Sequence, residues 1–208
     1  MFFPKTPEER LNYIQNRIQK AALSVGRKPK EITLVAITKK FPVEIWNQAI
    51  NLNITTIGES RIQEAQEKTE SFLKRDKIKL HFIGHLQSNK VRKAIDLFDV
   101  IQTVDSIKLA KKIDGICKEK HKNQSLYLQV NTGSDPKKYG ISKINILKAA
   151  QEITKMKNLK LEGIMTIPPQ NISKTQLRSI FKKTREIRDE ILIKINEYCK
   201  YISMGMSN

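Results

Sequence analysis

Apolar and polar positions follow two periods that alternate along the chain. Residues 32–38 read Ile-Thr-Leu-Val-Ala-Ile-Thr, a short β-branched run typical of a strand covered on both faces. Before it, apolar residues recur at helical spacing from Leu11 to Val25, and Thr6 with Glu9 forms a capping-box pattern, which predicts an amphipathic helix. Further strands are predicted at residues 54–57, 80–83, 100–103, 126–130, 161–166 and 201–204, and further helices at 42–50, 62–73, 91–98, 107–120, 144–156 and 174–198. Such strict alternation indicates an α/β fold with parallel strands.

Two architectures fit this order of elements, an open doubly wound sheet or a TIM-type (β/α) barrel, and the periodicity does not decide between them. A closed barrel needs eight strands, whereas the chain stops at Asn208, just after the seventh. The sheet is therefore expected either to be open or to lack its last strand. No Ser/Gly-rich linker or shift in composition divides the chain, so residues 1–208 are predicted to form one domain.

The chain is strongly basic, with 39 Lys and Arg against 21 Asp and Glu and a formal net charge of +18. This charge would suit nucleic acid, but the lysines are spread along the whole chain and aromatic residues make up only 6%. No apolar stretch approaches the roughly 20 residues of a membrane helix. Cys117 and Cys199 show neither metal-ligand spacing nor a disulfide framework, so a cytoplasmic location is expected.

Reactive groups of parallel α/β folds lie where strands end, and the first strand ends in Lys39 and Lys40. A lysine packed there among apolar residues would lose hydration and offer a free amine to a carbonyl group. Strand alternation points the two side chains in opposite directions, so only one can enter a site. In a chain this rich in lysine, the motif alone is better explained by two solvated lysines.

Other strand ends offer weaker signals. Ser203-Met-Gly-Met-Ser supplies hydroxyl and amide groups suited to a phosphate, although a turn that needs Gly for its conformation explains it equally well. His81 is expected to be packed or hydrogen-bonded, His85 lies in a loop near the presumed site, and His121 is expected at the surface. No metal-ligand cluster, P-loop, dinucleotide fingerprint or hydrolase motif is present, so no metal site and no catalytic residue are predicted.

Taken together and in order, the strand ends resemble those of one family, the pyridoxal-phosphate homeostasis proteins. The matching runs are residues 34–42, 58–64, 81–90 (His-Phe-Ile-Gly-His-Leu-Gln-Ser-Asn-Lys), 163–168 and 203–207, of which 81–90 is the most specific. The resemblance implies a barrel similar to the N-terminal domain of alanine racemase that holds pyridoxal 5′-phosphate as a Schiff base.

By the same resemblance, particular residues acquire roles. Lys39 matches the Schiff-base lysine, and the phosphate-holding turn is matched by Ser203, Gly205 and Met206. Asn131 and Met165 match positions beside the cofactor ring, and Lys138 occupies a loop near the same pocket. The chain departs from the family pattern in two ways. It has Ser60 where Asn is usual, and it lacks a final strand resembling Arg-Ile-Gly-Thr-x-Ile-Phe-Gly. Because that strand helps to hold the cofactor in the family, we expect a weakened phosphate site.

The function expected on this basis is reversible binding of pyridoxal phosphate within intracellular cofactor homeostasis, without catalysis. The protein would be a monomer or weak dimer that makes transient contact with pyridoxal-phosphate-dependent enzymes. The first alternative is an amino-acid racemase, which requires a second base facing the substrate. The second is a nucleic-acid-binding protein driven by the +18 charge, whose affinity would fall steeply with salt.

Overall fold

The structure, a computed structural model, describes residues 5–133 and 139–205. Its strands are β1 (Ala36–Ile37), β2 (Thr56–Glu59), β3 (Lys79–Phe82), β4 (Val100–Val104), β5 (Gln124–Gln129), β6 (Leu159–Met165) and β7 (Tyr201–Ser203). Its α-helices are α1 (Pro7–Leu23), α2 (Glu44–Asn51), α3 (Ile62–Ser71), α4 (Val91–Leu97), α5 (Ile107–Glu119), α6 (Ile146–Thr154) and α7 (Lys174–Lys194). The predicted α/β alternation is confirmed.

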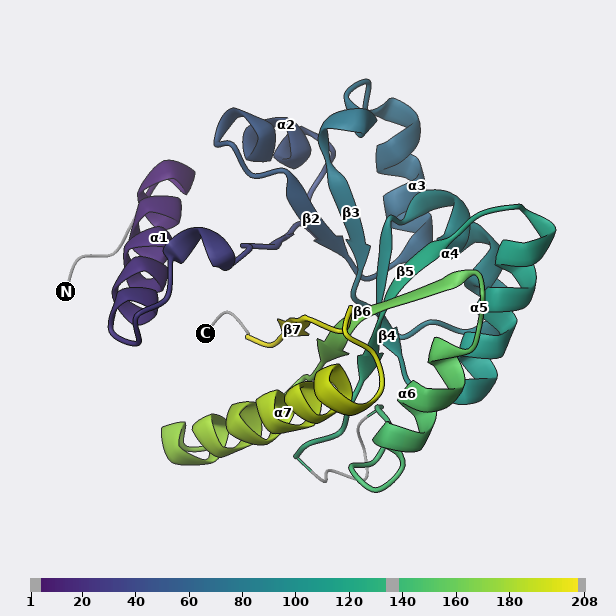
Figure 1. Cartoon of the computed structure of the whole chain (residues 1–208). Helices are drawn as coiled ribbons and strands as arrows, with labels where there is room; N and C mark the ends of the chain where they lie inside the picture. The colour runs from purple at the N-terminus through teal and green to yellow at the C-terminus, as the bar shows by residue number, and fades with distance from the viewer. Residues whose placement is uncertain (1–4, 134–138, 206–208) are drawn as a thin grey trace.

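All seven strands lie in one parallel sheet whose spatial order is the chain order, β1 to β7. A doubly wound sheet reverses its strand order part-way, so this order excludes that alternative and leaves the barrel-type fold. Figure 1 shows the sheet curling into part of a barrel with helices along its outside. Within the described residues β1 and β7 each pair with one strand only, so the barrel is open between them.

The first strand is shorter than the sequence predicts. Of residues 32–38, only Ala36 and Ile37 pair as a strand, with Ile57 and Gly58 of β2. In this register residues 32–34 lie before the level at which β2 begins, at Thr56. The capping box predicted for the first helix is confirmed, since the Glu9 amide donates to the Thr6 hydroxyl and Glu9 in turn accepts from the Thr6 amide, both at 3.1 Å.

The two faces of the sheet differ in what they bury. Ile57, Leu80, Ile101, Leu126 and Ile164 lie in the main hydrophobic core, which includes residues of the surrounding helices. The intervening positions face the concave side, where Val100, Tyr127 and Met165 form a second, separate apolar cluster. The concave face also carries buried polar side chains, and the ends of the strands on that face are where a site is expected.

Both cysteines are buried in the layer between helices and sheet. Burial raises the pKa of the Cys117 thiol to about 11, with Asp114 adding to the effect and Lys122 opposing it. Burial likewise raises the pKa of Cys199 to about 12, against the opposing charge of Arg188. Neither thiol is therefore ionised near neutral pH, so both act as packing residues.

Candidate functional site

The residues singled out from the sequence lie at one end of the sheet. Lys39 follows β1, Asn131 follows β5, Met165 ends β6 and Ser203 ends β7. Because parallel strands end at the same edge, these positions share one rim of the partial barrel. Gly205, with a φ of 138°, is the last described residue of the turn after β7. Met206 and Lys138 lie outside the described residues.

Lys39 lies in the turn that follows β1, at the rim of the partial barrel. The Thr38 hydroxyl contacts Trp46 of α2, so Thr38 points into the helical layer. Alternation then places Ile37 on the opposite, concave face, which agrees with the contact that a side chain at Gly58 would make with Ile37. The Lys39 side chain is exposed, which agrees with the interpretation of two solvated lysines and not with an amine packed among apolar residues. The reason is that β1 is an edge strand, and Ile37 of that strand is itself 42% exposed.

A chain of three polar side chains crosses the concave face from β7 to β3. The Ser203 hydroxyl donates to Gln102 Oε1 at 2.6 Å, and Gln102 Nε2 lies 2.6 Å from His81 Nδ1. Strands β5 and β6 lie between β7 and β4 in the sheet, so Ser203 reaches Gln102 only because the sheet curls. The expected packed and hydrogen-bonded state of His81 is confirmed.

The protonation of His81 follows from this chain. Burial lowers its pKa to about 4, the positive charge of Lys79 adds to the effect, and Asp99 opposes it. The ring is therefore neutral at pH 7, and because Nδ1 accepts from the Gln102 amide, the proton is assigned to Nε2. Nε2 is buried without a hydrogen-bond partner among the described residues, so the concave face holds an unused donor.

Gln102 was not singled out in the sequence, although it is buried and links the two predicted residues Ser203 and His81. The signal that could have found it is a polar side chain inside the otherwise apolar run 100–104. Strand alternation would have placed it on the concave face with Val100, and a buried amide there requires partners.

The strand ends next to Asn131 and Met165 are held by hydroxyl groups. Thr132 Oγ1 lies 2.9 Å from Thr166 Oγ1 and 3.1 Å from Thr184 Oγ1 of α7. Thr166 also donates to the carbonyl of Val130 at 3.0 Å. These buried bonds join the ends of β5 and β6 to one helix, so the backbone that carries Asn131 and Met165 is fixed.

The loop after β5 reaches back to the loop after β3. The Asn131 amide donates to the Ile141 carbonyl at 3.0 Å, and Gln129 Nε2 donates to the Tyr139 carbonyl at 3.1 Å. The Tyr139 ring stacks on His85, with ring centroids 3.8 Å apart. His85 therefore belongs to the rim of the partial barrel, where the sequence placed it.

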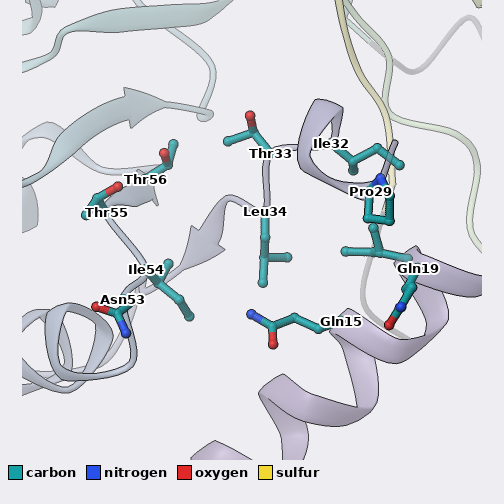
Figure 2. A pocket seen from close by; sticks show the side chains of 11 residues that line it. Gln15, Gln19, Pro29, Ile32, Thr33, Leu34, Asn53, Ile54, Thr55 and Thr56 are labelled. Atoms are coloured by element: carbon teal, nitrogen blue, oxygen red, sulfur yellow. The ribbon is translucent and has the colours of Figure 1, made fainter. Parts of the chain in front are cut away.

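Two hollows are present among the described residues, and the second of them lies beside His85 at the rim of the partial barrel. The first, of about 450 Å³, lies between α1 and the segments before β1 and β2, where Figure 2 shows Gln15, Leu34 and Thr55 around it. The second, of about 700 Å³, lies beside the start of α3 and is lined by Ser60 and His85 among others. Neither hollow is lined by Lys39 or Ser203.

Within residues 5–133 and 139–205, no three His, Cys, Asp or Glu side chains are grouped as metal ligands would be. No helix of this part of the chain is long and apolar enough to cross a membrane.

Comparison with known proteins identifies the family. Residues 11–208 match the family model described as alanine racemase, N-terminal domain. The chain is also 34% identical over 203 residues to the pyridoxal phosphate homeostasis protein of Aquifex aeolicus, a match that covers 96% of this chain and 87% of that protein. The chain belongs to the pyridoxal phosphate homeostasis protein family. Its curated relatives are named as homeostasis proteins, not as enzymes.

Solved structures agree with this family and fold. PipY of Synechococcus elongatus, solved with PLP bound, is 28% identical, has a TM-score of 0.81 and covers 94% of this chain and 90% of its own. Alanine racemase of Clostridium difficile is 17% identical, has a TM-score of 0.70 and covers 93% of this chain but 50% of its own. The latter likeness shows the fold alone, which this member of the homeostasis family shares with one part of the racemase.

Proposed function

We propose that this chain binds pyridoxal 5′-phosphate reversibly and takes part in the intracellular homeostasis of that cofactor. The observation that carries the proposal is the relative PipY, whose structure holds PLP and which aligns with 94% of this chain. The position of Lys39, just after the carboxyl end of β1, is where a barrel of this kind presents reactive groups.

Two features of the structure fit such a ligand. The buried Nε2 of His81 is a donor without a partner among the described residues, on the face that a ligand would enter. The turn after β7 has Gly205 in a conformation that side chains rarely adopt, with open space where a Cβ would lie. A backbone turn of this kind lets amide groups approach a phosphate closely.

In this proposal Lys39 supplies the amine, and Ser203 with Gly205 and Met206 supplies the phosphate turn. Met165 and Asn131 flank the ring. When bound, the cofactor would supply an aldehyde, and Lys39 would hold it through its side-chain amine. Lys39 is exposed, so its amine is accessible to a ligand that arrives from solvent.

We further propose that the chain is not a racemase. Racemisation needs a second group that accepts a proton on the other face of the substrate. Tyr127 is the buried phenol of the concave cluster, and burial, with smaller contributions from Glu162 and Tyr201, raises its pKa, so it stays protonated and cannot act as that base.

The test is to incubate the protein with pyridoxal phosphate, reduce it with borohydride and map the labelled peptide. We expect the label on Lys39, its loss in Lys39→Ala and its retention in the matched control Lys40→Ala. Absence of label from Lys39 in the unsubstituted protein would contradict the proposal. Rapid exchange of the α-proton of alanine in deuterated solvent would instead favour a racemase.

We propose, in addition, that the chain acts as a monomer or weak dimer and delivers the cofactor by transient contact with pyridoxal-phosphate-dependent enzymes. Fluorescence of the loaded protein mixed with a cofactor-free enzyme would follow the transfer. A transfer rate that depends on the concentration of the acceptor enzyme is expected, whereas a rate equal to that of release into buffer would contradict direct contact.

A further inference from the structure

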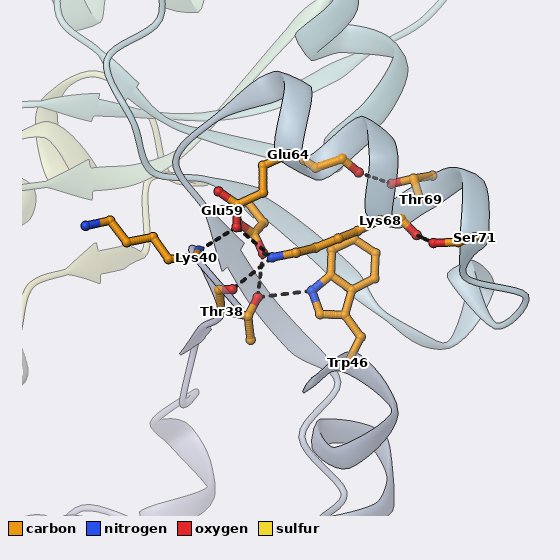
Figure 3. Close-up of polar contacts among 9 residues, drawn as sticks. Thr38, Lys40, Trp46, Glu59, Glu64, Lys68, Thr69 and Ser71 are labelled. Atoms are coloured by element: carbon orange, nitrogen blue, oxygen red, sulfur yellow. Dashed lines mark hydrogen bonds and ion pairs between the residues drawn. The ribbon is translucent and has the colours of Figure 1, made fainter. Parts of the chain in front are cut away.

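A buried ion cluster lies behind Lys39, on the helical side of the sheet. Lys68 of α3 is 5% exposed, and Glu59, the last residue of β2, is fully buried. Lys68 Nζ lies 2.7 Å from Glu59 Oε1 and 2.9 Å from Glu64 Oε1, and it donates to the Thr38 carbonyl at 2.9 Å (Figure 3). An ammonium group has three N–H donors, so all are used. Lysine is rarely buried unless it is paired in this way.

The cluster holds both peptide groups that flank Lys39. The Thr38 carbonyl, which belongs to the peptide before Lys39, accepts from Lys68. The Lys40 amide, which belongs to the peptide after Lys39, donates to Glu64 Oε1 at 2.5 Å. Both partners come from α3, four residues apart and paired with each other. A single helix therefore fixes the direction in which the Lys39 side chain leaves the backbone.

The Glu64 carboxylate is charged at neutral pH. Burial raises its pKa, but the hydrogen bonds from Lys68 and from the Lys40 amide, together with the positive charges of Lys68 and Arg61, outweigh that effect, and the net result is a pKa below the ordinary value. The charged form is the better acceptor for the Lys40 amide, because a hydrogen bond to an ionised group is stronger than one between neutral groups.

Lys40 itself adopts a backbone conformation that a side chain disfavours. Its φ is 67°, in the left-handed region, which costs roughly 1–2 kcal/mol for a residue with a Cβ. The bond to Glu64 holds the backbone there, and Figure 3 shows the Lys40 side chain extending away from the cluster. The sharp turn after Lys39 thus separates the directions of two adjacent, chemically identical amines.

Thr38 and Trp46 complete the cluster. The Thr38 hydroxyl donates to Glu59 Oε1 at 2.7 Å and accepts from Trp46 Nε1 at 3.0 Å. Glu59 Oε2 has no hydrogen-bond partner in the part of the chain that the structure describes. Loss of the Lys68 charge would leave a fully buried carboxylate without its cation, which is more costly than losing an exposed ion pair.

We propose that Lys68, with Glu59 and Glu64, is a positioning cluster that selects Lys39 over Lys40 as the amine that meets a carbonyl ligand. Lys68 acts through the backbone on either side of Lys39 and does not touch the ligand. The proposal rests on the proposed function for the identity of the ligand. The arrangement of the backbone can be tested without any ligand.

The first test measures selectivity. The protein is treated with pyridoxal phosphate and borohydride, and the ratio of label on Lys39 to label on Lys40 is determined by peptide mapping. The variant combines Lys68→Met with Glu59→Gln, so that no carboxylate is left buried without a cation. We expect the ratio to fall about tenfold, equivalent to ~1.4 kcal/mol, and to recover in part in Lys68→Arg. An unchanged ratio in the folded double variant would overturn the proposal.

The second test needs no ligand and uses hydrogen exchange of the Lys40 amide. We expect about tenfold faster exchange in Glu64→Ala, a variant at a partly exposed position that should fold even if changes at Lys68 do not. Unchanged exchange would overturn the proposal. The matched control is Lys194→Met, which removes a lysine paired at the same 2.9 Å with Glu190 on α7 and should alter neither readout.

The two proposals fail in different ways. If neither lysine of the unsubstituted protein is labelled, the proposed function fails. The hydrogen-exchange rate of the Lys40 amide in Glu64→Ala then still tests whether the cluster holds the backbone. If Lys39 is labelled in the unsubstituted protein and the variants label it with the same selectivity, the proposed function stands and the positioning role fails.

Discussion

Gly163 lies directly against Tyr201 across the β6–β7 pair. A Cβ built on Gly163 would sit 2.4 Å from the Tyr201 carbonyl oxygen, a distance at which the backbone of one strand must move. The same pairing aligns Met165 with Ser203 two positions further on. The absence of a side chain at Gly163 therefore sets the place of the phosphate turn proposed above.

We predict that Gly163→Ala destabilises the protein by about 1–3 kcal/mol, the range for inserting atoms into a packed site, and displaces Ser203 from Gln102. Urea unfolding would measure the first effect and cofactor affinity the second. Gly115→Ala is the control, because nothing lies within 4 Å of its Cβ position in the middle of α5. That change should stabilise the protein by roughly 0.5–1 kcal/mol. Equal effects of the two substitutions would contradict the prediction.

His81 makes stability depend on pH. Its folded pKa of about 4 lies below its ordinary value of 6.5, so the unfolded chain binds more protons between these values. The free energy of unfolding is therefore expected to fall as pH drops from about 6.5 to about 4, by on the order of 3 kcal/mol from this group alone. Urea titrations of His81→Gln at several pH values should show a flatter profile, whereas the exposed His85→Gln should keep the slope. The same slope in both variants would disprove the assignment.

Lys40→Gly should raise stability by up to about 1 kcal/mol, because glycine adopts a φ of 67° without the clash of a Cβ. Thermal unfolding measures the gain. Asn53→Gly is the comparison, since Asn53 has a φ of 58° but asparagine tolerates this region better than lysine does. A loss of stability in Lys40→Gly larger than in Asn53→Gly would show that the Lys40 side chain contributes more than the backbone strain costs.

Gln102→Leu should destabilise the protein by about 1–3 kcal/mol, because the His81 nitrogen and the Ser203 hydroxyl both lose their partner. A double-mutant cycle with Ser203→Ala, measured by urea unfolding, should show coupling of about 0.5 kcal/mol or more. Strictly additive effects would mean that the two side chains are energetically independent despite their 2.6 Å separation.

Local patterns predicted the elements well, and the curvature of the sheet less well. The capping box at Thr6 and the alternation of strands with helices are determined by residues close together in the sequence, so both could be predicted from it. The exposure of Lys39 depends on whether another strand lies beside β1, which no local period reports. The sequence placed Lys39 directly after the first strand, as the structure does, but that pattern did not report whether its side chain is buried or exposed.

The polar partners of the site were harder to predict for the same reason. Lys68 lies in a helix whose sequence is rich in charge, and nothing in that period distinguishes a buried lysine from a solvated one. Its burial arises because α3 packs over the ends of β1 and β2, where Thr38 and Glu59 present polar groups. The bond between Gln102 and Ser203 could not be predicted, because it forms only where the curl of the sheet brings β7 close to β4.

The alkylation rates of the two buried thiols report which part of the protein unfolds first. Cys199 comes two residues before the edge strand β7, whereas Cys117 sits in α5 over the middle of the sheet. An alkylating reagent reacts with either sulfur only after the surrounding layer parts and the thiol meets water. Faster alkylation of Cys199 than of Cys117 would mean that the region around β7 unfolds locally before the rest. Equal rates would mean that both thiols become exposed in one cooperative unfolding step.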